Sequence, residues 1–197
     1  MNHQLDRLFS ILSSESFLTM QGLVNGIPIY VQPYNVRDED HVAAMIRALA
    51  QRLRTSGIKV AEVNLFQLLL DELGADDLLE GLIDGEIDHQ RKDLLETLKN
   101  YAEPKSHIVP RLGAIMAEEG VRLTLVSGVG HIYPFLRAHK LLNTVEQGTL
   151  PHPMVMFFPG EYILIPGQGS QLRLFGSQPA KGYYRAFNLD HYRLAPK

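Results

Sequence analysis

Short apolar runs rich in β-forming residues alternate along this chain with longer segments in which apolar residues recur at helical spacing. In the first third, residues 27–32 and 58–64 have the length and composition of buried strands. Between them, apolar side chains repeat every three or four residues from Val42 to Leu53, and Gly57 ends the repeat. A strand, a helix and a strand with short connections predict a parallel crossover. A short helix over residues 4–18 is expected before it.

Residues 65–120 are predicted to be almost wholly helical, with breaks at Gly74 and Gly85. Pro110 must lie near the start of its helix, because a proline in a helix interior costs about 3 kcal/mol. This segment is therefore expected to form a helical insertion between the second and the third strand.

Four apolar blocks in the last third predict the remaining strands. They are LTLVSG from Leu123, MVMFFPGEY from Met154, LRLFG from Leu172 and YYRAFNL from Tyr183. Pro134 fits the first turn of a helix over residues 134–145, since an N-terminal proline loses no intrahelical hydrogen bond. The predicted fold class is therefore α/β: a single domain over residues 1–197, with a central, mostly parallel sheet of about five or six strands, flanking helices and a helical insertion near 65–120.

Composition limits the class of protein. The chain has 197 residues, of which 45% are hydrophobic, so it can form one well-buried core. It has no cysteine, which removes disulfides, thiolate catalysis and cysteine-ligated metal sites. No apolar run approaches the roughly 18 residues of a membrane span, and the N-terminus does not look like a signal peptide. These features predict a soluble, cytoplasmic protein with no membrane partner.

Charge is divided unevenly along the chain. Residues 1–120 hold 11 Lys and Arg against 19 Asp and Glu, whereas residues 121–197 hold 8 against 3. Much of the acid lies between Asp71 and Glu96, which indicates a solvated helical face or a surface that meets a basic partner. In either case, this acidic middle segment would repel nucleic acid.

The turn Ser127-Gly128-Val129-Gly130 is the best candidate for a phosphate-binding loop, because backbone N–H groups at a helix start attract anions. A dinucleotide fingerprint would need a third glycine where Tyr133 stands, and the Gly-Lys-Ser/Thr of a P-loop occurs nowhere in the chain. The spacing therefore favours a tight turn over a nucleotide site.

Other catalytic motifs are also absent, because the residue spacing that each requires does not occur. Neither Ser127 nor Ser170 has the flanking glycines of a hydrolase nucleophile elbow. The eight histidines contain no HExxH pair and no close cluster, and His139 shares a predicted helical face with Phe135 and Leu142. The sequence therefore predicts no catalytic residue, no cofactor, no metal and no enzymatic activity.

The segment KGYYRAF, which begins at Lys181, starts like an RNA-recognition motif, whose aromatic side chains stack on bases. Tyr184 stands where that motif needs a small residue, and Arg185 stands where it needs an aromatic one. The segment is therefore interpreted as a strand that packs aromatic side chains into the core. Direct nucleic-acid binding is not expected.

The C-terminal blocks, in this order and at these distances, resemble the BrxB family of BREX bacteriophage-defence systems. The resemblance rests on LTLVSGVGHIYPFLRAHKLLN, MVMFFPGEY, LRLFG and YYRAFNL, and it is strongest over residues 123–189. The stretch between Tyr162 and Leu172 is longer than the short polar turn expected in relatives. The resemblance implies a cytoplasmic component of a multi-protein system that restricts phage. It further implies a protein-binding or scaffold role without assigned activity, with other BREX proteins as partners and PglZ as the favoured direct one.

Two loops expected at the carboxyl edge of the sheet supply candidate partner-binding residues. His131 and Tyr133 follow the third predicted strand, and Glu161 and Tyr162 follow the fourth. Arg137 is expected one turn further along the predicted helix. Aromatic and arginine side chains are enriched in binding hot spots, so these five residues form the predicted partner site.

Two alternatives stay open at the level of sequence. Glu161 could form an internal ion pair with Arg137, Arg173 or Arg185 and so serve structure rather than binding. The chain could also be a degenerate nucleotide- or nucleic-acid-binding α/β protein, in which case ATP, GTP or DNA would raise its melting temperature.

Overall fold

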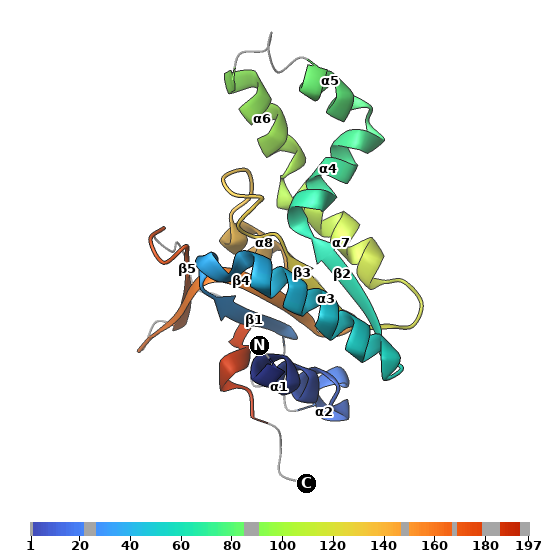
Figure 1. Ribbon diagram of the computed structural model, residues 1–197. Coiled ribbons are helices and arrows are strands. Elements are labelled where there is room, and N and C mark those ends of the chain that lie inside the picture. Colours follow the sequence, from blue (N-terminus) through green and yellow to red (C-terminus); the bar gives the residue numbers. More distant parts are fainter. Residues whose placement is uncertain are drawn as a thin grey trace.

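The computed structural model describes residues 2–21, 27–84, 91–146, 150–166, 169–178 and 186–193. Within these residues, six strands form one sheet in the order β2, β3, β4, β1, β6, and β5 pairs with the far part of β4. Helices cover both faces of the sheet (Figure 1). The α/β class predicted from the sequence is therefore confirmed. The strands are β1 Ile29–Tyr34, β2 Lys59–Asn64, β3 Val121–Ser127, β4 Met154–Ile165, β5 Gly169–Leu174 and β6 Phe187–Asn188.

Every pairing along the path from β2 to β6 is parallel. The central strand β4 begins with Met154 to Pro159, all buried, because neighbouring strands and helices enclose it on every side. A strand buried on both faces needs an unbroken apolar run, and that is how this block reads in the sequence. The second half of β4, from Gly160, pairs in antiparallel fashion with β5 and forms a hairpin.

The sheet separates two apolar cores, because successive side chains of a strand point to opposite faces. Val155 and Phe157 of β4 face a core shared with α1 and α3, whereas Met156 and Phe158 face a core shared with α4, α7 and α8. The helices are α1 Asn2–Leu12, α2 Glu15–Leu18, η1 Val36–Asp38, α3 Glu39–Thr55, α4 Leu65–Ala75, α5 Leu78–Asp84, α6 Arg91–Tyr101, the π-helical turn η2 Pro104–Ile108, α7 Val109–Met116, α8 Ala138–Glu146 and η3 Leu189–His191.

Helix α3 follows directly from its apolar spacing. The positions from Val42 to Leu53 that repeat at helical spacing are buried against the sheet. Glu39 and Asp40 stand in the first turn, where the helix dipole favours negative charge. Gly57 follows the helix with a φ of 82°, a left-handed conformation that glycine adopts without steric cost.

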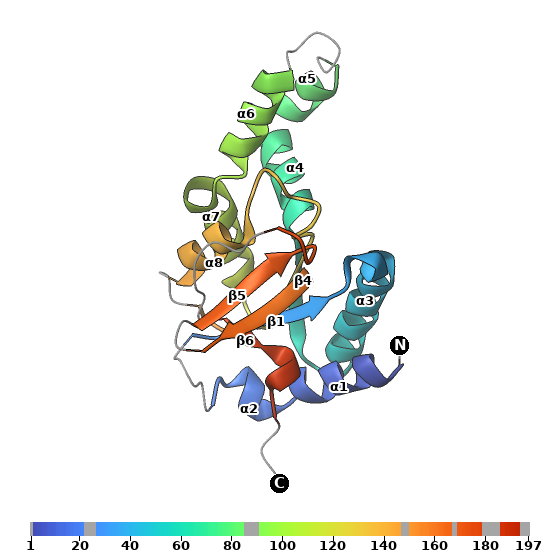
Figure 2. The same cartoon turned by 90° about the vertical axis from the view of Figure 1, so that its left-hand side faces the viewer.

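Helices α4, α5 and α6 form an arm that extends away from the sheet (Figures 1 and 2). Its base is packed, since Leu69 and Leu73 of α4 have no exposed surface. Tyr101, at the end of α6, donates a hydrogen bond to Asp76, which follows α4. The predicted helical insertion is thus confirmed, and it projects from the body of the protein.

The breaks within this insertion lie partly where the sequence predicts them. Gly74 is inside α4, and the chain turns instead at Asp77, whose φ is 57°. Pro110 lies in the first turn of α7, as its missing N–H requires. The second expected break, Gly85, lies outside the described residues.

Two expected element boundaries are wrong, and the last predicted strand is described only in part. Pro134 does not start a helix: the chain makes a series of turns, with a cis peptide bond between Tyr133 and Pro134, and α8 begins at Ala138. The fourth strand, expected to end at Phe158, continues to Ile165 because its second half pairs with β5. Of the last predicted strand, only Phe187–Asn188 is observed as β6, and residues 183–185 lie outside the described residues.

Candidate functional site

The carboxyl ends of the parallel strands meet at one edge of the sheet, where α/β proteins commonly bind ligands. Strand β1 ends at Tyr34, opposite Pro159 of β4, and β2 ends at Asn64, opposite Ser127 of β3. We call these strand ends, together with the loops that follow them, the carboxyl edge. The predicted binding residues after β3 and along β4 belong to it.

His131 lies at the carboxyl edge beside the end of β1. Its Nδ1 is 3.7 Å from Glu39 Oε1, and Tyr34 Oη donates a hydrogen bond of 2.6 Å to Glu39 Oε2. Burial, together with this bond to a carboxylate, raises the pKa of Tyr34 above its ordinary value. Glu39 therefore joins β1 to the loop that follows β3.

Tyr133 packs against the segment that follows β5. Its ring meets that of Phe175 edge to face, with centroids 5.9 Å apart. Its Oη lies 3.3 Å from Gln178 Oε1 and donates a hydrogen bond to it. Tyr133 therefore connects the loop after β3 to the base of the hairpin, where β5 ends.

Glu161 and Tyr162 lie on opposite faces of the hairpin, because they are successive residues of β4. Glu161 Oε2 is 3.5 Å from Arg173 Nη1, on the residue directly across the hairpin. Tyr162 Oη donates a 3.0 Å hydrogen bond to the Ala186 carbonyl, and its ring meets that of His191 edge to face. Glu161 thus makes the internal ion pair that the sequence left open, with Arg173 as its partner.

Arg137 faces a different cavity. It precedes α8, is exposed, and helps to line a volume of about 480 Å³ together with residues of α6 and η2. In the part of the chain that the structure describes, it forms no ion pair with Glu161, and Arg185 lies outside that part. The five predicted residues therefore fall into three groups: His131 with Glu39, the three residues around the hairpin, and Arg137 alone.

The glycines of the turn after β3 are accounted for by packing. Gly128 has a φ of 76°, and a Cβ at this position would lie 2.3 Å from Asn64 Oδ1. That oxygen accepts hydrogen bonds of 3.0 and 3.2 Å from backbone N–H groups in the first turn of α4. A Cβ at Gly130 would lie 3.1 Å from Pro159 Cγ. Each glycine thus lets a neighbouring element approach closely, and neither requires a bound phosphate.

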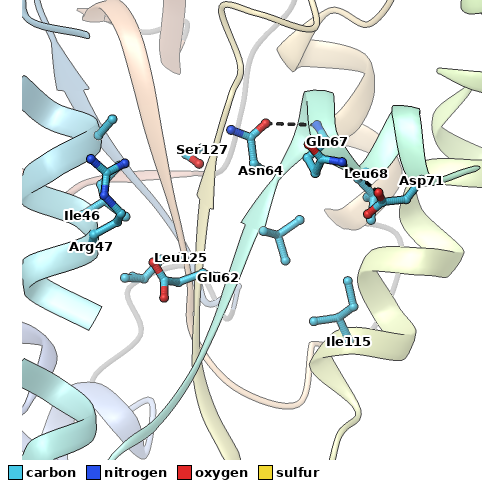
Figure 3. Close-up of a pocket in the computed structure, with 12 residues that line it drawn as sticks. Ile46, Arg47, Glu62, Asn64, Gln67, Leu68, Asp71, Ile115, Leu125 and Ser127 are labelled. Carbon is cyan, nitrogen blue, oxygen red and sulfur yellow. Dashed lines mark hydrogen bonds between the residues drawn. The ribbon is translucent and has the colours of Figure 1, made fainter. Parts of the chain in front are cut away.

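A second cavity, of about 350 Å³, lies beside the edge strand β2 and is lined from both faces of the sheet (Figure 3). We call it the edge cavity. Its volume lies within the range of small-ligand pockets, about 300–1,000 Å³. Both acids among its described lining residues have partners, since Glu62 pairs with Arg54 at 2.7 Å and Asp71 accepts a hydrogen bond from Gln67. Arg47 lines it from α3 and is exposed, without an ion pair to any described residue.

The buried polar groups hold the fold together. Thr124 Oγ1 and His152 Nε2 are 2.8 Å apart, and burial lowers the pKa of His152, which keeps its ring neutral near pH 7. Among the residues that the structure describes, no three His, Cys, Asp or Glu side chains gather closely enough to hold a metal ion. In the same residues, no helix has the length and apolar character needed to cross a membrane.

Sequence reasoning missed three residues of the carboxyl edge. Tyr34 and Glu39 flank the turn after β1, and Asn64 ends β2. The available signal was the parallel arrangement itself, which brings polar residues after every strand to the same edge, not only those after the third and fourth.

These features define an α/β protein with a parallel sheet, an antiparallel hairpin built on its central strand and a projecting helical arm. A family model described as BREX protein BrxB matches residues 61–189. The protein of that name from Bacillus cereus (strain H3081.97) is 28% identical over 194 residues, covering 95% of this chain and 96% of the relative. The protein of that name from Escherichia coli O9:H4 (strain HS) is 26% identical over 191 residues, covering 96% and 91%. No solved structure matches significantly.

The chain therefore belongs to the BrxB family and is a component of a BREX system. The resemblance of its four C-terminal blocks to this family is confirmed. Within the stretch between Tyr162 and Leu172, which is longer than the turn expected in relatives, Ile163 to Ile165 of β4 pair with Gly169 to Gln171 of β5, and residues 167–168 lie outside the described residues.

Proposed function

We propose that this protein is a non-enzymatic, cytoplasmic subunit of a BREX antiphage system that binds other BREX proteins and holds them together. Membership of the BrxB family supports its place in that system. PglZ is the favoured direct partner, because the resemblance to BrxB proteins implies a role beside it. The proposal concerns binding and scaffolding, with no chemical step assigned to the chain.

The observation that carries the proposal is that the polar side chains of the carboxyl edge contact one another. A partner-binding surface needs side chains that are already held in position, because ordering them on binding costs free energy. Here Glu39 is shared between His131 and Tyr34, and Glu161 faces Arg173. The polar side chains at this edge are therefore engaged with one another, which suits a surface that keeps its shape for a protein partner.

The test is co-purification of the tagged protein from cells that carry its complete neighbouring operon. We expect a BREX protein, PglZ first, to be retained and identified by mass spectrometry. Retention of no BREX protein from such cells would refute the scaffold role. A gene that lies apart from methyltransferase, PglZ-like and ATPase genes would also count against it.

The candidate residues differ in how cleanly they can be tested. Arg137→Ala should weaken capture of the partner while leaving the melting temperature nearly unchanged, since the side chain is exposed and makes no ion pair with described residues. Tyr162→Ala is less informative, because Tyr162 is half-buried and bonded to the Ala186 carbonyl. Glu161→Gln tests the same strand and keeps the hairpin paired.

The edge cavity favours a second candidate, binding of a small anion or nucleotide. Arg47 would be the cation that holds it. Thermal shift measurements with ATP, GTP and DNA test this candidate directly. A rise in melting temperature that Arg47→Glu abolishes would support it, and no response to the panel would remove it.

A further inference from the structure

The cavity that Arg137 lines has a composition unlike that of the carboxyl edge. It lies between the arm and the turns before α8, with a volume of about 480 Å³. We call it the basic groove. Its lining residues are Leu95, Lys99, Ala102, Glu103, Pro104, Pro134, Phe135, Leu136, Arg137 and Lys140.

Three cations surround the basic groove without a matching set of anions. Lys99, Arg137 and Lys140 are exposed, and none forms an ion pair within 4.0 Å among the described residues. The N-terminus of α8 lies between the last two, so the helix dipole adds partial positive charge there.

Glu103, the one acid among the described residues that line the groove, already accepts hydrogen bonds. Its Oε2 accepts hydrogen bonds from the N–H groups of Lys105 and Ser106, which cap η2. Partial burial acts to raise the pKa of Glu103, but these bonds and the nearby Lys140 outweigh it and lower the pKa. Glu103 therefore stays ionised as a cap and leaves a net positive groove.

The floor of the basic groove is apolar. Leu95, Lys99 and Ala102 share one face of α6 and its end, because they are four and three residues apart. Leu95 and Phe135 are half-buried, and Pro134 is exposed. An apolar floor inside a basic rim fits an apolar side chain flanked by carboxylates.

We infer that the basic groove binds an acidic, amphipathic segment of another BREX protein, with carboxylates on its three cations and an apolar side chain on its floor. This inference rests on the proposed function and names the surface that performs it. Arg137, singled out from the sequence as a partner residue, belongs to this surface.

Charge complementarity favours a protein segment over nucleic acid. A nucleic-acid strand needs a continuous basic track, since it carries a phosphate at every step. Here the cations end at Lys99, and the described residues 71–84 and 91–96 of the arm hold eight Asp and Glu against two Lys and Arg. A short acidic segment fits the groove, whereas a longer polyanion meets repulsion along the arm.

The experiment reverses charge in the groove and compares a matched control. Arg137→Glu with Lys140→Glu changes the net charge by as much as Arg37→Glu with Arg193→Glu, and all four residues are exposed. The captured BREX protein is purified and its affinity measured for each variant. We expect the groove variant to bind at least about 30-fold more weakly and the control to bind within about threefold of wild type. Raising NaCl from about 0.05 M to about 0.3 M should weaken binding by the wild type and by the control, and should affect the groove variant much less.

A photo-reactive amino acid in place of Lys99 identifies the occupant. We expect cross-links to a stretch of the partner rich in Asp and Glu. Equal binding by the groove variant and the wild type would overturn the inference while leaving the scaffold role intact. So would capture that nuclease abolishes, which indicates nucleic acid, or cross-links to a second copy of this chain. Failure of the wild type to bind any BREX protein would instead overturn the proposed function.

Discussion

Replacing Gly128 by alanine tests whether packing alone explains the glycine-rich turn after β3. Gly128 has a φ of 76°, and a left-handed conformation costs an alanine about 1–2 kcal/mol. Its Cβ would also lie 2.3 Å from Asn64 Oδ1, far inside van der Waals contact. The Asn64 side chain must rotate away, so α4 loses its N-cap, at about 1 kcal/mol more. We therefore expect the free energy of unfolding to fall by about 2–3 kcal/mol.

Two further variants separate these contributions. An added Cβ at Gly57 meets no atom within 4 Å, although its φ is 82°. Gly57→Ala therefore reports the cost of positive φ alone, about 1–2 kcal/mol. Asn64→Ala removes the cap alone, at about 1 kcal/mol. In the Gly128→Ala background, where the cap is already displaced, Asn64→Ala should cost less than about 0.5 kcal/mol.

The assay is urea unfolding followed by far-ultraviolet circular dichroism, applied to the wild type, both single variants, the double variant and Gly57→Ala. The double-mutant cycle should show a coupling energy of about 1 kcal/mol between Gly128 and Asn64. Equal costs for Asn64→Ala in both backgrounds would mean that the two sites are independent. The close approach of the turn to the cap would then not be the reason for the glycine.

Three further predictions follow from buried or crowded positions. Because burial lowers the pKa of His152, the unfolded chain binds more protons below its ordinary pKa of 6.5, so stability should fall as pH drops from about 7.5 to about 5.5; His152→Gln should flatten that loss in urea unfolding. Gly160→Ala should cost about 3 kcal/mol or more, since its Cβ would lie 2.2 Å from the Arg173 carbonyl oxygen across the hairpin; a normal melting temperature would contradict this. Asp190→Ala removes the 3.1 Å acceptor of the buried Gln32 amide, which keeps a 3.2 Å bond to the Pro33 carbonyl, and also removes the 3.2 Å pair with Arg7. The two losses together should cost about 1–2 kcal/mol in urea unfolding, and Gln32→Leu in the same chain should restore only the part that is due to Gln32.

The fold was predictable where local spacing and burial agree. Helix α3 and strand β4 are examples, because the first repeats its apolar residues at helical spacing and the second is apolar without interruption. The turns before α8 were not predictable in this way. Pro134 is compatible with a helix start by local rules, and the chain around it instead follows the packing of Tyr133 against Phe175, far away in sequence.

The candidate site was only partly predictable, because its members are brought together by strand order. Parallel strands place the residues after β3 and β4 at one edge, which local reasoning could anticipate. Strand β1 lies beside β4 in the sheet, although 119 residues lie between Tyr34, the last residue of β1, and Met154, the first residue of β4. For this reason the carboxylate that lies 3.7 Å from His131 Nδ1 belongs to Glu39, which no local pattern near position 131 indicates.

The residues that mark the family differ from those that we infer to bind a partner, and the difference has a physical reason. The blocks that mark the family are buried strands and close-packed glycines, such as the run from Met154 and the turn at Gly128, and their substitution is costly for stability. The groove that we infer to bind a partner is built from exposed side chains of different elements, with Lys99 on the arm and Arg137 before α8. Charge reversal at such positions leaves the fold nearly unchanged. Core residues therefore identify the protein, and the surface must be tested directly to learn what it binds.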